Sequence, residues 1–176
     1  MGGEGTGGRG ADGPNPGNVA EGGRPVRVVV SGADTDGRFA LVETRERPGG
    51  EPPLHAHTRE DEVVYVLEGR VTVSVEGERR DCPTGAAVLL PRGREHAFRV
   101  ESREARLLVL LLPAGLEGLY QEVGGATGTH DMERLVTISA RYGVEITGPN
   151  PLAGYGDDGS VGARRSRSGA DAARRR

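Results

Sequence analysis

Three of the four histidines and one glutamate of this 176-residue chain stand at a spacing that suits metal binding. His55 and His57 are two residues apart, Glu62 follows them, and His96 completes the set. On a β-strand, residues two apart point to the same face, so His55 and His57 can bind one ion together. Imidazole nitrogens and a carboxylate suit a divalent transition metal such as Fe, Mn, Co, Ni or Zn. We therefore predict that His55, His57, Glu62 and His96 are metal ligands.

Such a ligand set also indicates the kind of molecule that would bind. Three neutral imidazoles and one carboxylate leave a net charge of about +1 on a divalent ion. An ion of that charge favours an anionic ligand such as an enolate, a phenolate or a carboxylate. A six-coordinate metal with four protein ligands keeps roughly two positions for water, substrate or O₂. The sequence therefore predicts a small-molecule substrate.

Short apolar strands separated by glycine and proline turns surround the predicted ligands. In Val71–Val75, valines alternate with Thr72 and Ser74, which is the pattern of a strand with one buried face. His55 and His57 lie on a segment that leads from a loop into a strand. The charged turn residues Glu60 and Asp61 are expected to be exposed to solvent; hydrogen bonding to the histidines is the alternative for them. Strands this short indicate a sandwich or barrel. The other predicted strands are Pro25–Val30, Arg38–Arg45, Glu62–Leu67, Ala86–Leu90, His96–Val100 and Arg106–Leu112.

Two short helices are predicted after the last strand. Apolar residues recur at helical spacing in Leu116–Val123 and in Met132–Arg141. Asp131 is the predicted N-cap of the second helix, and Gly143 is its predicted C-cap. We expect the helices to cover one end or one face of the barrel. The residues predicted to form one face of the second helix are Met132, Leu135, Val136 and Ser139.

The two ends of the chain differ in composition from the middle. Residues 1–24 are rich in glycine, and residues 153–176 are rich in arginine, with few apolar residues in either segment. Neither can bury enough surface to offset its ordering entropy, so both are predicted to be disordered tails. The arginine-rich tail has no interleaved aromatic residues for base stacking, so we expect no nucleic-acid partner. The predicted barrel covers residues 25–113, and a helical extension covers 114–152.

Composition excludes several classes of protein. The net charge of −3 is too small to indicate a polyanionic partner. The single cysteine, Cys82, excludes an intramolecular disulfide and fits a reducing compartment; it lies in a stretch that reads as a turn. No apolar run approaches the roughly 18 residues of a membrane span, and no signal-peptide pattern is present. We therefore expect a cytoplasmic protein that does not insert into membranes.

The spacing of the ligands also resembles a known family. The patterns G(x)5HxH(x)4E(x)6G and G(x)5PxG(x)2H resemble the two signature motifs of the cupins. The resemblance covers Phe39–Pro113 and implies an all-β, double-stranded β-helix (jelly-roll) barrel whose cavity carries the metal. The residues that meet the two patterns are Gly49, His55, His57, Glu62 and Gly69, and then Gly85, Pro91, Gly93 and His96.

One position departs from the family pattern. The second motif usually continues to an asparagine four residues after its histidine, and Val100 stands at that position here. By strand alternation, Val100 faces the same way as His96 and Phe98. The asparagine is not a metal ligand, so its replacement leaves the predicted metal site intact. We predict that Phe98 and Val100 form an apolar wall of the substrate pocket; packing in the core is the alternative for Phe98.

Three functions from different classes fit the sequence. The chain resembles the quercetinase-like bacterial cupins with a single barrel, which implies a metal-dependent dioxygenase that uses O₂ on a small enolic or phenolic compound. In that mechanism the histidines stay bound and Glu62 acts as the catalytic base. A second possibility is a cyclase, isomerase or lyase of secondary metabolism, as among the polyketide-tailoring cupins. The third is a non-enzymatic small-molecule-binding module.

A homodimer is also expected from this resemblance. Pro25–Val30 precedes the barrel and could pair with the sheet of a neighbouring subunit, as in many single-barrel cupins. In the alternative arrangement, the same strand closes the barrel of its own chain.

Overall fold

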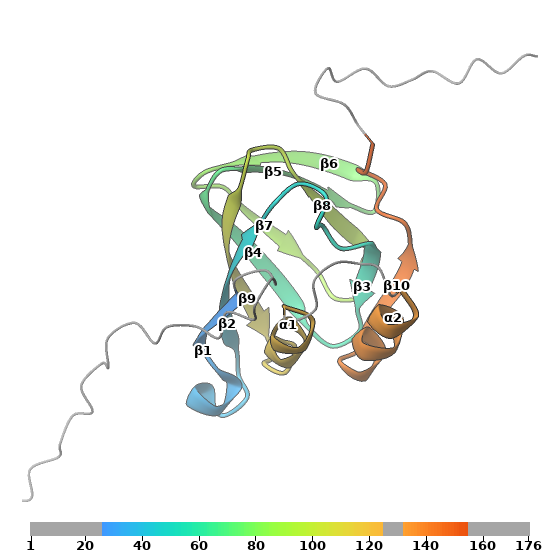
Figure 1. Cartoon of the computed structure of the whole chain (residues 1–176). Helices are drawn as coiled ribbons and strands as arrows, with labels where there is room; N and C mark the ends of the chain where they lie inside the picture. Colours follow the sequence, from blue (N-terminus) through green and yellow to red (C-terminus); the bar gives the residue numbers. More distant parts are fainter. Residues whose placement is uncertain (1–25, 125–131, 155–176) are drawn as a thin grey trace, which may run out of the picture.

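Two five-stranded antiparallel sheets face each other and form the body of the protein (Figure 1). The computed structural model describes residues 26–124 and 132–154. The first sheet has the order β1 (Val26–Val30), β2 (Ala40–Glu46), β9 (Ala105–Leu112), β4 (Asp61–Glu68) and β7 (Ala87–Leu90). The second has the order β10 (Val144–Gly148), β3 (Leu54–His57), β8 (His96–Val100), β5 (Arg70–Val75) and β6 (Glu78–Pro83). The predicted all-β jelly-roll fold is confirmed.

Aliphatic side chains from the inner faces of the two sheets form the core. Strand β2 alternates buried and partly buried residues along its whole length, as expected for a strand with one face toward the core. Val42, Val66, Val71 and Leu111 are among its most deeply buried side chains. Each such side chain stabilises the fold by about 1.5–3 kcal/mol relative to an exposed position. The core therefore needs almost no aromatic residues.

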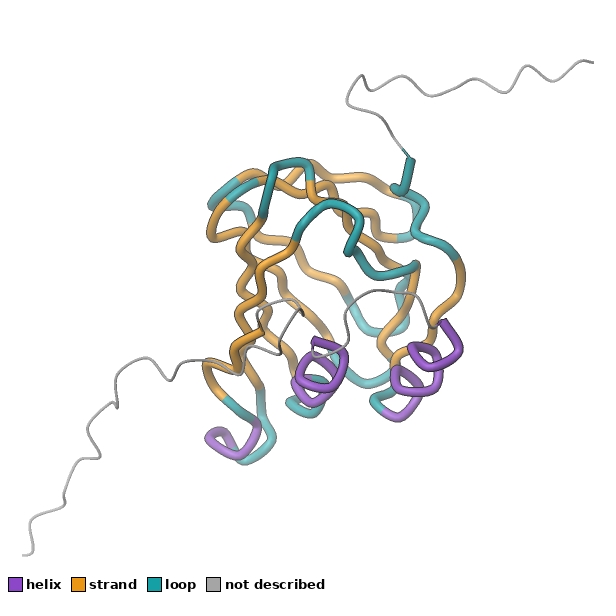
Figure 2. The backbone as a smooth tube through the Cα atoms, viewed as in Figure 1, coloured by secondary structure: helices purple, strands orange, loops and turns teal. Residues whose placement is uncertain are grey.

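Two helices lie together at one end of the barrel, at the bottom of the view in Figures 1 and 2. Helix α1 (Glu117–Gly124) contacts β1 and β2, and helix α2 (Met132–Arg141) contacts β10. An ion pair of 2.5 Å between Arg141 Nη2 and Glu122 Oε1 joins the two helices. A short 3-10 helix, η1 (Gly32–Thr35), follows β1. None of the described helices is long and apolar enough to cross a membrane.

The end of α2 agrees with the sequence prediction, but its buried face does not. Gly143 has a φ of 75° and its N–H donates to the carbonyl of Ala140, which closes the helix as predicted. Ser139 is buried as predicted, whereas Met132 and Val136 are exposed. The neighbour of Ser139, Ile138, is buried instead, because β10 meets the helix on the side that carries these two residues. The described residues do not include the predicted N-cap Asp131 or His130. Of the two predicted tails they include only Ala153 and Gly154.

Two strands were missed by the sequence prediction. Strand β6 contains Cys82, which is buried opposite Val71 of β5, so the turn predicted around this cysteine is wrong. Its four leading residues, Glu78 to Asp81, are all charged and carry no apolar alternation. Strand β10 lies within the predicted helical extension and pairs with β3. Strand β6 is recognisable only from its pairing, whereas the alternation of Val144 and Ile146 with Glu145 and Thr147 was an available signal for β10. Strand β1 pairs with β2 of its own chain, the second of the two arrangements considered for it.

A line of ion pairs crosses the outer face of the first sheet over four strands. Glu43 of β2 accepts from Arg27 of β1 at 2.5 Å and from Arg106 of β9 at 2.6 Å. Arg106 also donates to Glu68 of β4 at 2.9 Å. The Arg106 guanidinium, with a smaller contribution from Arg27, lowers the pKa of Glu43 to about 2, although partial burial acts in the opposite direction. Glu43 therefore links strands that are distant in the sequence.

We predict that Glu43→Gln destabilises the protein in a pH-dependent way. The Glu43 side chain is only 13% exposed, so its charged hydrogen bonds should contribute about 1–3 kcal/mol at neutral pH. Because its folded-state pKa is lowered, this contribution is present above the ordinary pKa of 4.5 and is lost as the pH falls toward about 2. Urea unfolding from pH 7 to pH 2 should show the difference between wild type and variant shrinking over that interval.

The matched control is Glu145→Gln. Glu145 is exposed on β10 and makes no ion pair with another described residue, so this variant should match the wild type at every pH. A pH-independent effect of Glu43→Gln would show that the charge of Glu43 is not what stabilises the sheet.

Candidate metal centre

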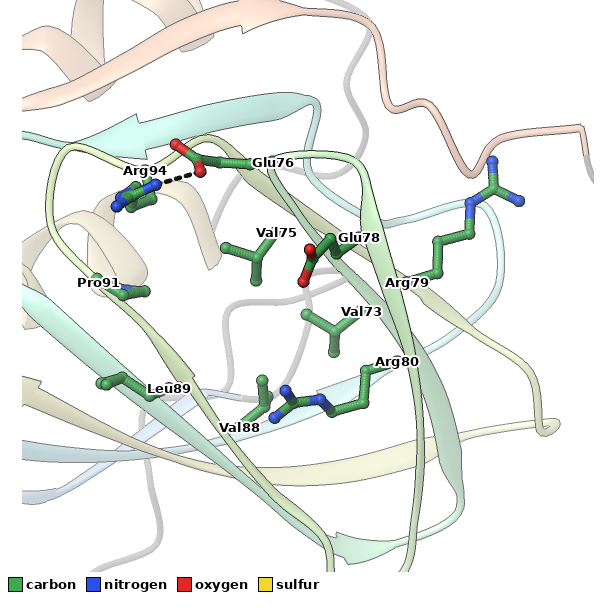
Figure 3. A pocket seen from close by; sticks show the side chains of 10 residues that line it. All are labelled: Val73, Val75, Glu76, Glu78, Arg79, Arg80, Val88, Leu89, Pro91 and Arg94. Carbon is green, nitrogen blue, oxygen red and sulfur yellow. Dashed lines mark hydrogen bonds and ion pairs between the residues drawn. The ribbon is translucent and has the colours of Figure 1, made fainter.

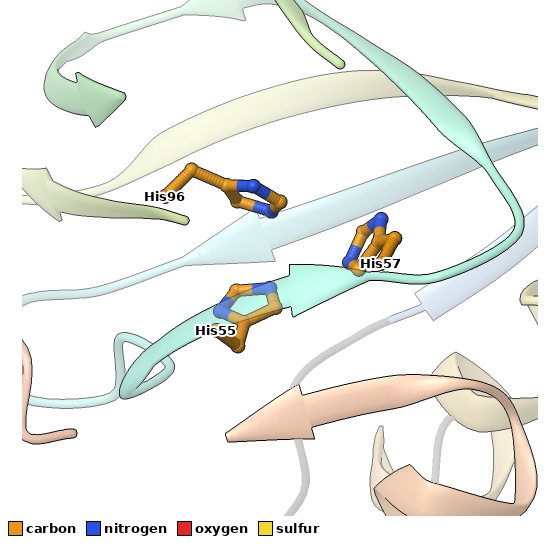
Figure 4. A group of neighbouring side chains, drawn as sticks. All are labelled: His55, His57 and His96. Carbon is orange, nitrogen blue, oxygen red and sulfur yellow. The ribbon is translucent and has the colours of Figure 1, made fainter. Parts of the chain in front are cut away.

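Three histidines meet on the inner face of the second sheet (Figure 4). His55 and His57 come from β3, and His96 comes from β8, where it lies directly opposite His55. The ring centroids are 4.4 Å apart for His55–His96, 4.8 Å for His57–His96 and 5.2 Å for His55–His57. One ligand atom from each ring lies within 4.8 Å of the other two. The structure therefore brings together the three histidines that the sequence spacing selected.

Backbone carbonyl groups orient two of these rings. His55 Nδ1 lies 2.8 Å from the carbonyl oxygen of Pro53, and His96 Nδ1 lies 2.9 Å from that of Arg94. With the proton on Nδ1, each ring donates to its carbonyl and presents Nε2 as a lone-pair donor. This arrangement of backbone acceptors behind the imidazoles is common in protein metal sites.

Several buried polar atoms of the histidines and of the nearby acidic residues have no hydrogen-bond partner among the described residues. They are His57 Nδ1, His96 Nε2, Glu62 Oε2 and Glu60 Oε2. Buried polar atoms almost always have partners, and each one without a partner costs about 1–3 kcal/mol. Imidazole nitrogens and carboxylate oxygens are a donor set that a divalent transition metal satisfies. The residues present therefore fit a bound metal ion of this class.

Burial keeps the three imidazoles in their neutral, metal-binding form. Desolvation, together with a smaller effect of the neighbouring imidazoles, lowers the pKa of His55 to about 4 and that of His57 to about 2. Desolvation also lowers the pKa of His96. At neutral pH the site therefore offers three uncharged nitrogen ligands without competition from protons.

Glu62 lies beside the histidines but is not part of the three-histidine group. It is buried on β4, and its Oε2 lies 3.3 Å from Nδ1 of His57. Burial, with a smaller effect of the neighbouring Glu60 carboxylate, raises the pKa of Glu62 to about 7, although a hydrogen bond from Tyr120 acts to lower this pKa. A carboxyl group in this position is close enough to the histidines to join them as a ligand or to exchange a proton beside them. Its role as a ligand stays a prediction.

Two residues near Glu62 were not recognised from the sequence. Tyr120 of α1 hydrogen-bonds the Glu62 carboxylate, which no local pattern could indicate because the two residues belong to different elements. Glu60 was expected to be exposed and is only 2% exposed, so that expectation is wrong. Its position two residues before Glu62 was the available signal, since residues two apart in extended chain share a face. Asp61, in contrast, is partly exposed and pairs with Arg92.

The two predicted pocket residues lie further along the inner face of β8. Phe98 is opposite Val73 of β5, and Val100 is opposite Val71. Phe98 is partly buried against the core, and Val100 is buried within it. Both therefore follow His96 on the same face of the strand, as the alternation predicted, with Phe98 nearer to the histidines.

Comparison with known proteins supports this description. Residues 42–112 match the Cupin domain family. The chain is 30% identical over 103 residues to a quercetin 2,3-dioxygenase of Bacillus subtilis (strain 168), covering 58% of this chain and 31% of that protein. It is 37% identical over 91 residues to the polyketide synthase CurC of Streptomyces cyaneus, covering 51% of this chain and 58% of that protein.

A solved structure completes the comparison. The TT1209 protein of Thermus thermophilus is 36% identical to this chain, with a TM-score of 0.41, and the match covers 44% of this chain and 74% of that one. In the two curated relatives, by contrast, the chain spans less than two thirds of the protein.

We predict that His57→Ala removes bound metal from the protein. Three neutral imidazoles converge here, and loss of one leaves too few nitrogen donors for tight binding. Elemental analysis of natively purified protein should find close to one equivalent of a divalent transition metal in the wild type and less than about a tenth of that in the variant.

The control is His130→Ala, which removes the remaining histidine and should leave the metal content unchanged. Circular dichroism should verify that His57→Ala is folded, and His96→Gln provides a second variant if it is not. Equal metal content in wild type, His57→Ala and His96→Gln would exclude this site.

Proposed function

Because residues 42–112 of this chain belong to the Cupin domain family, we propose that the histidine site makes the protein a metal-dependent enzyme acting on a small enolic or phenolic metabolite. The observation that carries the proposal is the group of three neutral histidines beside a buried carboxyl group with a raised pKa. A bound divalent ion would supply Lewis acidity and favour the anionic form of such a substrate. The ion is one of Fe, Mn, Ni, Co and Zn, all of which accept these ligands.

Glu62 is the catalytic base in this proposal. A general base works best when its pKa lies near the working pH, and burial raises the pKa of Glu62 to about 7. Glu62 is therefore suited to take the proton from the hydroxyl group of an enol or a phenol. Tyr120 hydrogen-bonds the carboxylate, and Nδ1 of His57 lies 3.3 Å from its Oε2. The second contact keeps the carboxylate beside the histidine group.

Dioxygenation is the first candidate reaction, because one relative is a quercetin 2,3-dioxygenase. In this case O₂ is the second substrate. The second candidate is a cyclisation, isomerisation or elimination in secondary metabolism, for which the similarity to a polyketide synthase component is the supporting observation. Both use the same histidines and the same base. Binding of a small molecule without turnover is the third alternative.

We predict that the full chain, loaded separately with Fe, Ni or Co, consumes O₂ when supplied with quercetin or a related flavonol. Glu62→Gln should lower kcat by about 100-fold or more, because it removes the proposed base. Oxygen-electrode measurements together with product analysis provide the test. Glu133→Gln, which alters an exposed glutamate on α2, is the matched control and should keep full activity.

The same experiment separates the candidate reactions. No O₂ uptake over a panel of flavonols, other phenolics and diketones would rule out the dioxygenase. Turnover of a polyketide-like substrate under strict anaerobiosis would support the cyclase or isomerase instead. Tight binding without turnover under either condition would favour the non-enzymatic alternative.

We also propose that the protein is a homodimer that packs through the outer face of the first sheet. Strand registers place Leu41, Leu110, Val63 and Leu89 in one row across β2, β9, β4 and β7. Leu89 is 54% exposed, and Tyr65 on the same face is 41% exposed. Contiguous apolar side chains on a sheet surface mark an interaction site, and a second copy of this sheet is a complementary partner.

We predict that Leu110→Glu converts the dimer to a monomer, because it places a charge in the middle of this row. Light scattering coupled to size-exclusion chromatography measures the mass. Val136→Glu, which introduces the same charge at an exposed apolar position on α2, should leave the dimer intact. A monomeric wild type, or a dimer that survives both Leu110→Glu and Val63→Glu, would contradict this interface.

A further inference from the structure

A cavity of about 510 Å³ opens between β6 and β7, each of which is an edge strand of one of the two sheets (Figure 3). Its apolar lining includes Val73, Val75 and Val88. Its charged lining includes Glu78 and Arg80 of β6. A volume of this size is typical of sites for small molecules. None of the three histidines lines the cavity itself. The strand registers give the position of the cavity relative to the histidines.

The registers show that Arg80 extends from the inner face of β6. Arg80 lies opposite Val73, and Glu78 lies opposite Val75. Residues directly opposite each other in an antiparallel pair share a face, and Val73 is buried in the core. Figure 3 shows the Arg80 side chain reaching across the cavity toward Val88, whereas Arg79 points away from it. Arg80 is therefore an inward-facing cation at an open gap in the barrel.

Arg80 differs from Arg70 and Arg94 in having no anionic partner within the part of the chain that the structure describes. Arg94 pairs with Glu76 at the rim of the cavity, and Arg70 pairs with Asp81 on the outer face. The Arg80 side chain makes no hydrogen bond or ion pair with any residue in 26–124 or 132–154. A guanidinium is charged at every working pH, and its fixed fork of donors matches a carboxylate. The cavity thus presents an anion-binding group over an apolar floor.

The distance between Arg80 and the histidines sets the length of a ligand that reaches both. His96 lies opposite Val75 on β5, and Val75 lies opposite Glu78 on β6. Strand β6 is therefore two strands from β8, or about 10 Å at the usual strand spacing. Arg80 lies one inward position further along β6. A ligand with two or three fused rings has this length.

We propose that this cavity binds an elongated, mainly apolar compound with a carboxylate at one end, and that Arg80 binds the carboxylate. The proposal refines the substrate class of the proposed function and rests on it, because the other end of the compound would reach the histidines. Glu78 lies on the same inner face and would repel a second carboxylate, so the site favours compounds with a single one. Val73, Val75 and Val88 contact the apolar body of the ligand.

A matched pair of probes tests this proposal. We expect 2-naphthoate to bind the full-length, natively purified protein about 10-fold more tightly than 2-naphthamide, which has the same shape without the charge. Arg80→Gln should remove this preference while leaving naphthamide binding unchanged. Arg103→Gln alters an exposed arginine away from the cavity and should retain the preference. Titrations followed by NMR or calorimetry measure the affinities.

Repeating the titrations with His57→Ala separates Arg80 from the histidine site. A preference that survives His57→Ala and disappears in Arg80→Gln supports the proposal, even if elemental analysis then finds no metal and the proposed function fails. A preference that disappears in His57→Ala and survives Arg80→Gln assigns the carboxylate to the histidine site, which overturns the proposal and leaves the proposed function standing. Equal binding of the two probes, or binding of neither, would also overturn it.

Discussion

The candidate site depends on the pairing of β3 with β8, which places His55 directly opposite His96. A shift of one residue in this register would turn the histidines of β3 to the outer face of the sheet and dissolve the group. The contact between the two strands is short, and β10 holds β3 from its other side, with Val144 opposite His57 and Ile146 opposite His55. Helix α2 packs on β10 in turn. The C-terminal elements are therefore part of the scaffold of the site.

The site also concentrates groups that are unfavourable in a protein interior. Four of them are buried and have a polar atom with no hydrogen-bond partner among the described residues: His57, His96, Glu60 and Glu62. Such atoms destabilise the fold unless a ligand satisfies them, and the aliphatic core of the barrel supplies the compensating stability. Burial favours the neutral form of both kinds of group, so it lowers the pKa of the imidazoles and raises the pKa of the carboxyl groups. One apolar environment thus prepares both the ligands and the proposed base.

The gap between β6 and β7 gives the two edge strands a second role. Inward-pointing charges on an edge strand discourage pairing with another chain, and Glu78 and Arg80 fit that description. The same side chains line the cavity together with Val75, which lies opposite His96. Because the barrel does not close at this edge, Glu78 and Arg80 can both discourage strand pairing and contact a ligand in the cavity.

The amino-acid sequence by itself determined the ligand spacing and the strands with regular alternation. His55, His57 and His96 were identified because same-face positions on strands follow a fixed period, and Gly143 was identified because a left-handed helix end favours glycine. Strand β6 could not be predicted in this way, because it begins with four charged residues. Strand β10 does show the alternation, in which Val144 and Ile146 alternate with Glu145 and Thr147, but it is short and was included in the predicted helical extension.

Only the tertiary structure decided which side chains surround Glu62 and which line the cavity. The contact of Tyr120 with Glu62 joins segments far apart in the chain, and the burial of Glu60 and the inward direction of Arg80 depend on how the strands pack. Local periodicity predicts which residues share a face of one strand. It does not predict which strand lies beside it or what covers its end, because those are set by packing of the whole barrel.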